Sequence, residues 1–206
     1  MSRDAMKIID ADPVRMIDLP GVGPCPRPVD IDQRVTGFQR VKSLRIYRFQ
    51  PGLAIHGDSE VDEVFILPLS GSFDMQISGA HPLSARVSAT GPTRALYMTP
   101  GHSYVLTPQG PVTVAYARAG AQGRVPCQTL STIDGAGVAE HLRCRLVDLI
   151  TGQTLSLGGG GECLVHVADG ALDLSDQTIA MGQTLALSEA VMLRAKCDAR
   201  LLIIGV

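Results

Sequence analysis

Two stretches of the chain match each other, and this internal repeat constrains the fold more than any other feature. The matching segments are EVFILPLSGSFDM (63–75) and ECLVHVADGALDL (162–174). They align three polar or glycine positions at one constant offset: Glu63 with Glu162, Gly71 with Gly170 and Asp74 with Asp173. A second match, in the same order, pairs PGHSYVL (100–106) with MGQTLAL (181–187). Two matches in the same order predict a duplicated domain.

Short β-like segments fill both copies. Each is rich in branched or apolar residues and is bounded by Gly, Pro, Ser or Asp, and a spacing of about 8–12 residues is typical of sandwiches and barrels. No segment of about twelve residues or more has helical periodicity. We therefore predict an all-β fold with strands near 44–49, 53–56, 63–69, 72–77, 95–98, 104–107 and 112–117, and near 142–150, 153–157, 162–167, 171–174, 184–187, 191–194 and 200–204.

Four regions follow from this pattern. The Pro- and Gly-rich residues 1–40 form an arm or loop with a short strand near 14–17. We expect the first repeat at 41–120, a Gly-rich connector at 121–141 and a second, shorter repeat at 142–206. Within the first repeat, residues 78–94 are expected to form a long loop that serves as a lid or an oligomer contact.

Composition excludes several classes of function. Eighteen basic and twenty acidic residues with no Trp argue against a nucleic-acid partner. No apolar run reaches the roughly 18 residues of a membrane span, and the first residues lack a signal-peptide pattern. Five cysteines without CxxC spacing fit reduced thiols in the cytoplasm. Because exposed sheet edges favour pairing between protomers, we expect a homodimer.

The order of strands and turns in each repeat resembles the cupin fold, a small jelly-roll β-barrel. The first cupin motif is similar to PGLAIHGDSEVDEVFILPLSG (51–71), and the second is similar to TPGHSYVL (99–106). This resemblance implies a bicupin, in which two jelly-roll barrels follow the N-terminal arm.

A narrower resemblance concerns residues 44–150. The succession EVFILPLSGS, ALYMTPGHSYVLTPQGPVTVAYARA and HLRCRLVDLI is similar to the family of 5-deoxyglucuronate isomerase and related sugar-acid isomerases. The family implies an isomerase acting on a carboxylated sugar, with a His/Glu metal cluster in its second cupin. The corresponding segment here, GQTLSLGGGGECLVHVADG, has no such cluster. The C-terminal pattern also resembles the bicupin accessory proteins of histidine utilisation.

A metal site can be assembled from the first repeat. His56 and Asp58 are two residues apart and share a face of a strand, and Glu63 follows on the next strand. His102 or Tyr104 of the second motif would complete the shell. Such ligands would hold a divalent ion, Zn, Mn, Fe or Ni, which would polarise a carbonyl and hydroxyl pair while Glu63 or Tyr104 carries a proton.

This prediction depends on which way the strand faces point. Glu63 shares a face with Phe65 and Leu67, and we expect this face to line the barrel. Arg48 is a candidate for binding a substrate carboxylate if it enters the barrel, and otherwise it is an exposed charge at a sheet edge. His166, between Val165 and Val167, is expected to be a satisfied core or surface histidine.

Two classes of function remain open. The first is a metal-dependent isomerase of a small carboxylated, sugar-like metabolite, and a metal-dependent dioxygenase is a third, weaker reading of the same site. The second class is a binding or regulatory bicupin that has lost its metal site and needs no cofactor. Both classes take a small molecule as their partner, and the position of the His56 ring relative to Glu63 and His102 distinguishes them.

Overall fold

The computed structural model describes residues 6–131 and 139–206. Strands make up nearly all of the regular structure, and the helix in these ranges is α1 (Gln33–Thr36). Asp32 begins it by accepting the backbone N–H groups of Arg34 and Val35, and Gly37 ends it with φ of 77°. The prediction of an all-β fold is confirmed. In the described part of the chain no helix has the length and apolarity that a membrane crossing requires.

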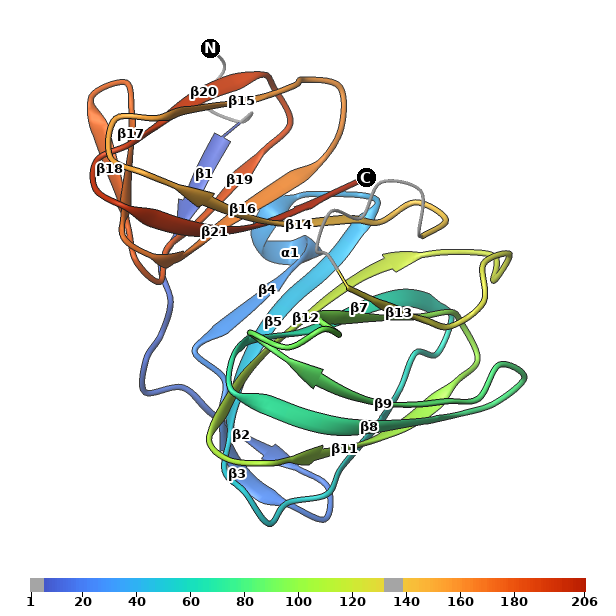
Figure 1. The fold of residues 1–206 in the computed structure, drawn as a ribbon. Helices are drawn as coiled ribbons and strands as arrows, with labels where there is room; N and C mark the ends of the chain where they lie inside the picture. The colour runs from blue at the N-terminus through green and yellow to red at the C-terminus, as the bar shows by residue number, and fades with distance from the viewer. Residues whose placement is uncertain (1–5, 132–138) are drawn as a thin grey trace.

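The first half of the chain forms two sheets with an apolar core between them, the lower lobe in Figure 1. Because residues two apart on a strand share a face, alternate side chains such as Val64 and Ile66 fill this core. The larger sheet has the order β13 (Gln128–Leu130), β10 (Ala95–Met98), β7 (Asp62–Ser70), β12 (Val112–Gly120), β5 (Val41–Phe49) and β4 (Val29–Asp32). The smaller has the order β6 (Ile55–Asp58), β11 (Ser103–Pro108), β8 (Ser72–Ser78) and β9 (Leu83–Ser88).

The second half repeats this arrangement in the upper lobe of Figure 1, around a core of its own. Its larger sheet has the order β1 (Met6–Ile9), β19 (Thr184–Leu187), β16 (Cys163–Asp169), β21 (Ala199–Gly205) and β14 (Arg143–Leu149). Its smaller sheet has the order β15 (Thr154–Leu157), β20 (Val191–Ala195), β17 (Ala171–Leu174) and β18 (Gln177–Ala180). The sequence β10-β7-β12-β5 in one half thus corresponds to β19-β16-β21-β14 in the other.

This correspondence supports one of the two sequence matches and corrects the other. Glu63 and Glu162 stand at equivalent places, at the starts of β7 and β16. The match of PGHSYVL with MGQTLAL is wrong, because β19 takes the place of β10 in its sheet whereas residues 103–106 belong to β11. Both segments follow a Gly turn into an apolar strand, so they look alike in sequence but belong to different sheets.

The N-terminal segment is divided between the two halves. β1 pairs with β19 at the edge of the second half, in the register Met6 with Leu187, whereas β4 pairs with β5 of the first half. Between them, the hairpin of β2 (Met16–Leu19) and β3 (Gly23–Pro26) covers the first half and buries Cys25 in its core. The short strand expected near 14–17 therefore begins at residue 16. Residues 78–94, expected to be a loop, contain β9.

A third apolar core joins the two halves. It is formed by the outer faces of the two larger sheets, where Phe65 and Leu67 of β7 and Leu44 of β5 meet Leu164 of β16 and Leu202 of β21. We call it the interlobe core. Because all of these side chains are fully buried, the halves are packed against each other as one body.

Candidate ligand-binding site

The predicted metal ligands of β6 face away from the core of the first half. Ile55 is buried in that core, and alternation along the strand leaves His56 and Asp58 exposed. The inward position between them belongs to Gly57, where even a Cβ atom would lie 2.5 Å from the hydroxyl oxygen of Tyr104. The prediction that His56 and Asp58 point into the barrel is wrong. Ile55 and position 57 face inward, and the side chains of His56 and Asp58 face outward, because successive residues of a strand point to opposite faces.

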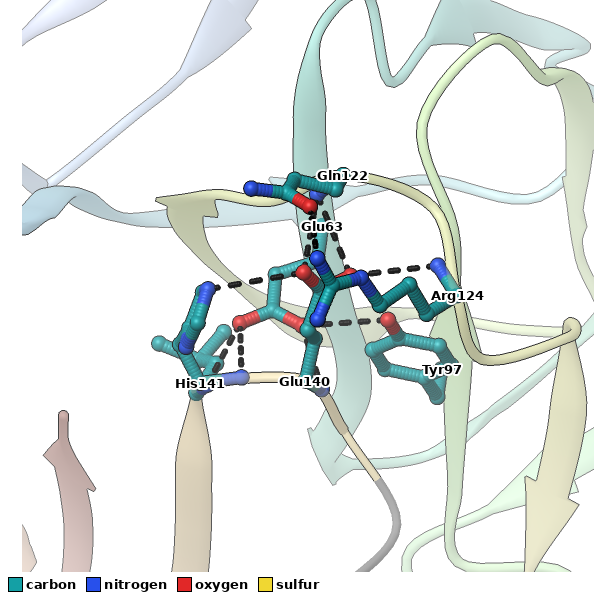
Figure 2. A network of polar contacts seen from close by, with 7 residues as sticks. Glu63, Tyr97, Gln122, Arg124, Glu140 and His141 are labelled. Atoms are coloured by element: carbon teal, nitrogen blue, oxygen red, sulfur yellow. Dashed lines mark hydrogen bonds and ion pairs between the residues drawn. The ribbon is translucent and has the colours of Figure 1, made fainter.

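Glu63 also lies on the other side of its sheet from the expected one. It does share a face with Phe65 and Leu67, but this face forms the interlobe core rather than the barrel interior. Figure 2 shows its fully buried carboxylate in a polar network. The Tyr97 hydroxyl donates to Oε2 at 3.0 Å, and burial beside this carboxylate raises the pKa of Tyr97.

Backbone N–H groups complete the shell of Glu63. The N–H of Glu140 donates to Oε2 at 2.9 Å, that of His141 donates to Oε1 at 2.9 Å, and that of Leu142 also donates to Oε1. These residues lead into β14, the first strand of the second repeat. The Glu140 carboxylate accepts the N–H groups of Arg124 and Gln122, which lower its pKa. Glu63 therefore fastens the start of the second half to the first.

Glu162, in the second half, binds the start of the first repeat in the same way. Its carboxylate accepts the backbone N–H groups of Gln39, Arg40 at 2.8 Å and Val41 at 2.7 Å. These residues lead into β5, the first strand of the first repeat. The repeated glutamates are thus two reciprocal clamps between the halves, and the repeat itself explains their presence without a metal.

The remaining predicted ligands are occupied or buried. His102 Nδ1 donates to the Pro100 carbonyl at 2.9 Å, and Nε2 accepts the N–H of His81 at 2.9 Å, so both ring nitrogens are used. Tyr104 packs in the core of the first half with its ring stacked on Tyr116. Burial raises the pKa of Tyr104 to about 12, which is poorly matched to proton transfer near neutral pH.

The predicted metal site is therefore not assembled. Asp58 and His102 do line one surface hollow together with Glu60, but His56 and Glu63 are not part of it. Within residues 6–131 and 139–206, no group of three or more His, Cys, Asp or Glu side chains is arranged to hold a metal ion. The divalent ion that a cupin fold implies does not fit these residues, because the carboxylate of Glu63 and both nitrogens of His102 are engaged within the protein.

A cavity lies between the halves, beside the interlobe core. Its volume is about 600 Å³, within the range of small-molecule sites. The first half contributes Ile46, Arg48, Leu69, Ser70 and Thr113; the second contributes His166, Ala168, Asp169, Met181, Gly182, Gln183 and Arg200; the N-terminal segment contributes Asp10, Ala11, Pro13, Pro28 and Val29. We call it the interlobe cavity.

Arg48 is the predicted site residue that this cavity contains. It lies on β5 two residues after Ile46, on the face that meets the second half, so it reaches the interlobe cavity rather than the barrel. The side chain is exposed, as the alternative expectation had it, although β5 lies between β12 and β4 rather than at a sheet edge. The Arg48 guanidinium has no hydrogen-bond or ion-pair partner among the residues that the structure describes. Arg200, across the cavity, is instead paired with Asp148 at 2.7 Å. An unpaired guanidinium at a cavity wall is suited to a carboxylate or phosphate oxygen.

Sequence reasoning missed the polar residues that the second half supplies. At the constant offset of the repeat, His166 and Asp169 replace Leu67 and Ser70. His166 is buried, and its Nδ1 lies 3.0 Å from Thr184 Oγ1, so the expectation of a satisfied histidine holds, but the residue also lines the cavity. A histidine in place of an apolar leucine, and a charged aspartate in place of a neutral serine, were the signal that could have revealed this wall.

The histidine in the wall makes stability depend on pH. Burial lowers the pKa of His166 to about 4, below its ordinary value of 6.5. Below pH 6.5 the unfolded chain therefore binds a proton that the folded chain does not, so stability falls as the pH drops from about 6.5 to 4. From the difference in pKa we expect a loss of about 3 kcal/mol over this window.

The variant His166→Leu, which copies Leu67 of the first half, tests this expectation. Urea unfolding between pH 7 and 4 should show a shallower loss of stability in the variant than in the wild type. His56→Leu is the matched control, because His56 is exposed and should leave the slope unchanged. Identical slopes for wild type and His166→Leu would contradict the assignment.

Comparisons with known proteins agree with this architecture. The model of the KduI/IolB family matches residues 26–138, more than half of the chain. No curated protein sequence matches. Among solved structures, YhhW from Escherichia coli is 11% identical with a TM-score of 0.76 and covers 98% of this chain and 97% of its own. That pirin has also been crystallised with nickel(II).

Two further structures have the same fold. An IolB-like protein from Salmonella typhimurium LT2 is 12% identical with a TM-score of 0.71, covering 87% of this chain and 88% of its own. A quercetin 2,3-dioxygenase from Acinetobacter baumannii is 14% identical with a TM-score of 0.71, covering 98% and 85%. At these identities the likenesses show the jelly-roll-like cupin fold and leave the chemistry to the residues themselves.

Proposed function

The chain belongs to the KduI/IolB family, and from this premise we propose that it binds a small carboxylated, sugar-like metabolite in the interlobe cavity. The observation that carries the proposal is Arg48, an unpaired guanidinium at the wall of a cavity of about 600 Å³. We propose a binding or regulatory role, because the side chains predicted to hold a metal are turned outward or engaged within the protein.

The other polar groups of the cavity suit the rest of such a ligand. Asp10 and Asp169 each have one carboxylate oxygen engaged within the protein, by Gln183 and by the Gly170 N–H. Their second oxygens can accept hydrogen bonds from hydroxyl groups of a ligand. His166 is neutral near pH 7, because burial lowers its pKa to about 4, and it adds no charge that would repel or trap an ion. Among the described residues that line the cavity, Arg48 is a cation without a partner and carboxylate oxygens lie on the walls around it. This arrangement is complementary to a hydroxylated monocarboxylate.

The setting we propose is the cytoplasm. All five cysteines are free thiols, and Cys25 and Cys144 are buried. Free thiols of this number are typical of proteins in reducing compartments.

Family membership favours a second candidate, an isomerase of a carboxylated sugar. Proton NMR of D-glucuronate incubated with the protein, with and without added Zn²⁺, Mn²⁺, Ni²⁺ or Fe²⁺, distinguishes the two. Conversion that depends on the protein and on a metal would favour the isomerase. Binding without conversion under every condition would favour the proposed role.

Binding itself is tested by calorimetric titration with D-glucuronate and D-gluconate, using D-glucose as the ligand without a carboxylate. Replacing Arg48 by Ala should weaken binding of both acids by about tenfold or more, because hydrogen bonds to charged groups contribute about 1.5–3 kcal/mol. Arg143→Ala is the matched control, since Arg143 is exposed on β14 and does not line the cavity. Equal affinities of Arg48→Ala and wild type, or no preference for acids over glucose, would contradict the proposal.

A further inference from the structure

One wall of the interlobe cavity comes from the N-terminal segment, which runs between the two halves. It is formed by Asp10, Ala11 and Pro13, which follow β1, and by Pro28 and Val29 at the start of β4. This part of the chain passes from the edge of the second half, where β1 lies, to the edge of the first half, where β4 lies. The N-terminal segment therefore closes a side of the cavity that would otherwise be open.

The outer part of this wall, residues 6–11, is held at a sheet edge by one strand pairing and by side chains that are at most partly buried. β1 has one neighbouring strand, β19, and none of its four side chains is fully buried. Its polar side-chain attachments are the Lys7 ammonium on the Val35 carbonyl, at 2.8 Å, and the Asp10 carboxylate, which accepts Gln183 Nε2 at 2.7 Å. Its apolar contacts are partly buried ones, of Met6 and Ile8 with the core of the second half and of Ile9 and Ala11 with the interlobe core. An edge strand without a buried side chain belongs to the least stable parts of a fold.

The inner part, from residue 12 onward, is fixed to the first half. The N–H of Asp12 donates to the Pro28 carbonyl at 2.8 Å, and the N–H of Arg27 donates to the Arg15 carbonyl at 3.0 Å. The hairpin that follows buries Cys25 in the core. Residues 6–11 can therefore leave β19 while the rest of the segment stays in place, with the bend at Asp12 and Pro13 as the pivot.

From this contrast we propose that residues 6–11 form a hinged strap over the interlobe cavity, latched by the hydrogen bond between Asp10 and Gln183. Opening of the strap exposes the cavity, and a bound ligand holds the strap closed because Asp10 and Ala11 are part of the wall. The opening itself is a property of the fold, whereas its coupling to a ligand rests on the proposed function.

Hydrogen exchange measured by mass spectrometry tests the opening without any ligand. Asp10→Ala removes the latch and should speed exchange of the β1 amides roughly two- to tenfold, the effect of one ordinary hydrogen bond, without changing exchange in β16. Asp10→Asn keeps an acceptor oxygen and should exchange like the wild type. Asp176→Ala is the matched surface control, because Asp176 lies in the turn between β17 and β18.

A thiol placed in the cavity reports whether the strap controls access. Ala168→Cys places the thiol there, because Ala168 lines the cavity. Adding Asp10→Ala to this variant should increase the rate at which a small thiol reagent labels the introduced thiol. The increase should equal the factor by which Asp10→Ala speeds amide exchange in β1. The proposal is overturned if β1 exchanges as slowly as β16, or if Asp10→Ala changes neither rate.

Coupling to ligand is measured in the same exchange experiment with D-glucuronate added. Slower exchange in β1 together with unchanged exchange in the distant strand β8 is the expected result. Calorimetric binding of D-glucuronate without any slowing in β1 would overturn the coupling but leave the proposed function standing. Absence of binding would overturn the proposed function, and the ligand-free rates would still decide whether the strap opens.

Discussion

Glu63→Ala should lower the free energy of unfolding by about 3–5 kcal/mol. The substitution leaves three backbone N–H groups and the Tyr97 hydroxyl without their acceptor, in a place where the carboxylate is fully buried. Each unsatisfied buried donor costs about 1–3 kcal/mol, but water can reach the half-buried Glu140 and the exposed His141, so the loss is smaller than the sum of four. Urea denaturation provides the measurement. Glu162→Ala should cost less, because this carboxylate is only half-buried and water can replace it.

Asp74→Ala is the control for Glu63→Ala. Asp74 sits in the same repeat and also binds other side chains, but its pair with Arg86 is exposed, and such pairs contribute no more than about 1 kcal/mol. A loss below about 1 kcal/mol for Glu63→Ala would contradict the clamp. If stability changed little but the metal content of the purified protein fell, Glu63 would instead be a metal ligand.

Gly170→Ala is the second change with a large expected effect, a loss of about 3–5 kcal/mol. Gly170 has φ of 78°, and a Cβ atom would lie 2.1 Å from the Asp198 carbonyl oxygen and 2.7 Å from the Cα of Ala199. A side chain in this backbone conformation costs about 1–2 kcal/mol, and overpacking against backbone adds about 1–3 kcal/mol. The repeat partner Gly71 has the same φ region and approaches the Pro111 carbonyl oxygen in the same way.

Gly52→Ala separates the two contributions. Gly52 has φ of 84° but no atom within 4 Å of the position of a Cβ, so only the conformational cost applies, about 1–2 kcal/mol. Thermal or urea unfolding of both variants gives the comparison. Equal losses for Gly170→Ala and Gly52→Ala would show that the close approach of the strands does not explain the repeated glycine.

Local pattern was sufficient to predict most of the fold. Every β segment predicted between residues 44 and 117 and between 142 and 204 contains or overlaps a strand, because apolar runs bounded by turn residues mark strands that are buried on one or both faces. β9 was missed because most of its side chains remain at least partly exposed, so its alternation is weak. β1 was missed because its partner, β19, lies at residues 184–187, and a pairing so distant leaves no trace in the local pattern.

The site could be predicted only in part, because its location depends on which face of each strand points into the barrel and which points toward the other half. The sequence places His56 and Asp58 on one face and Glu63, Phe65 and Leu67 on another, but it does not tell which face of β7 meets the barrel and which meets the other half. Two apolar faces of one strand look alike when both are buried. Arg48 was chosen for its chemistry and reaches a cavity that forms only when the halves pack together.

Calorimetric titration with D-glucuronate of wild type, Arg48→Ala and His56→Ala, each treated with chelator and then supplied with Ni²⁺ or Zn²⁺, decides between the interlobe cavity and a metal centre in the first half. We predict that Arg48→Ala loses about tenfold or more in affinity, that His56→Ala binds like the wild type, and that neither chelator nor metal changes the affinity. Binding that requires added metal and His56 but not Arg48 would contradict the interlobe site.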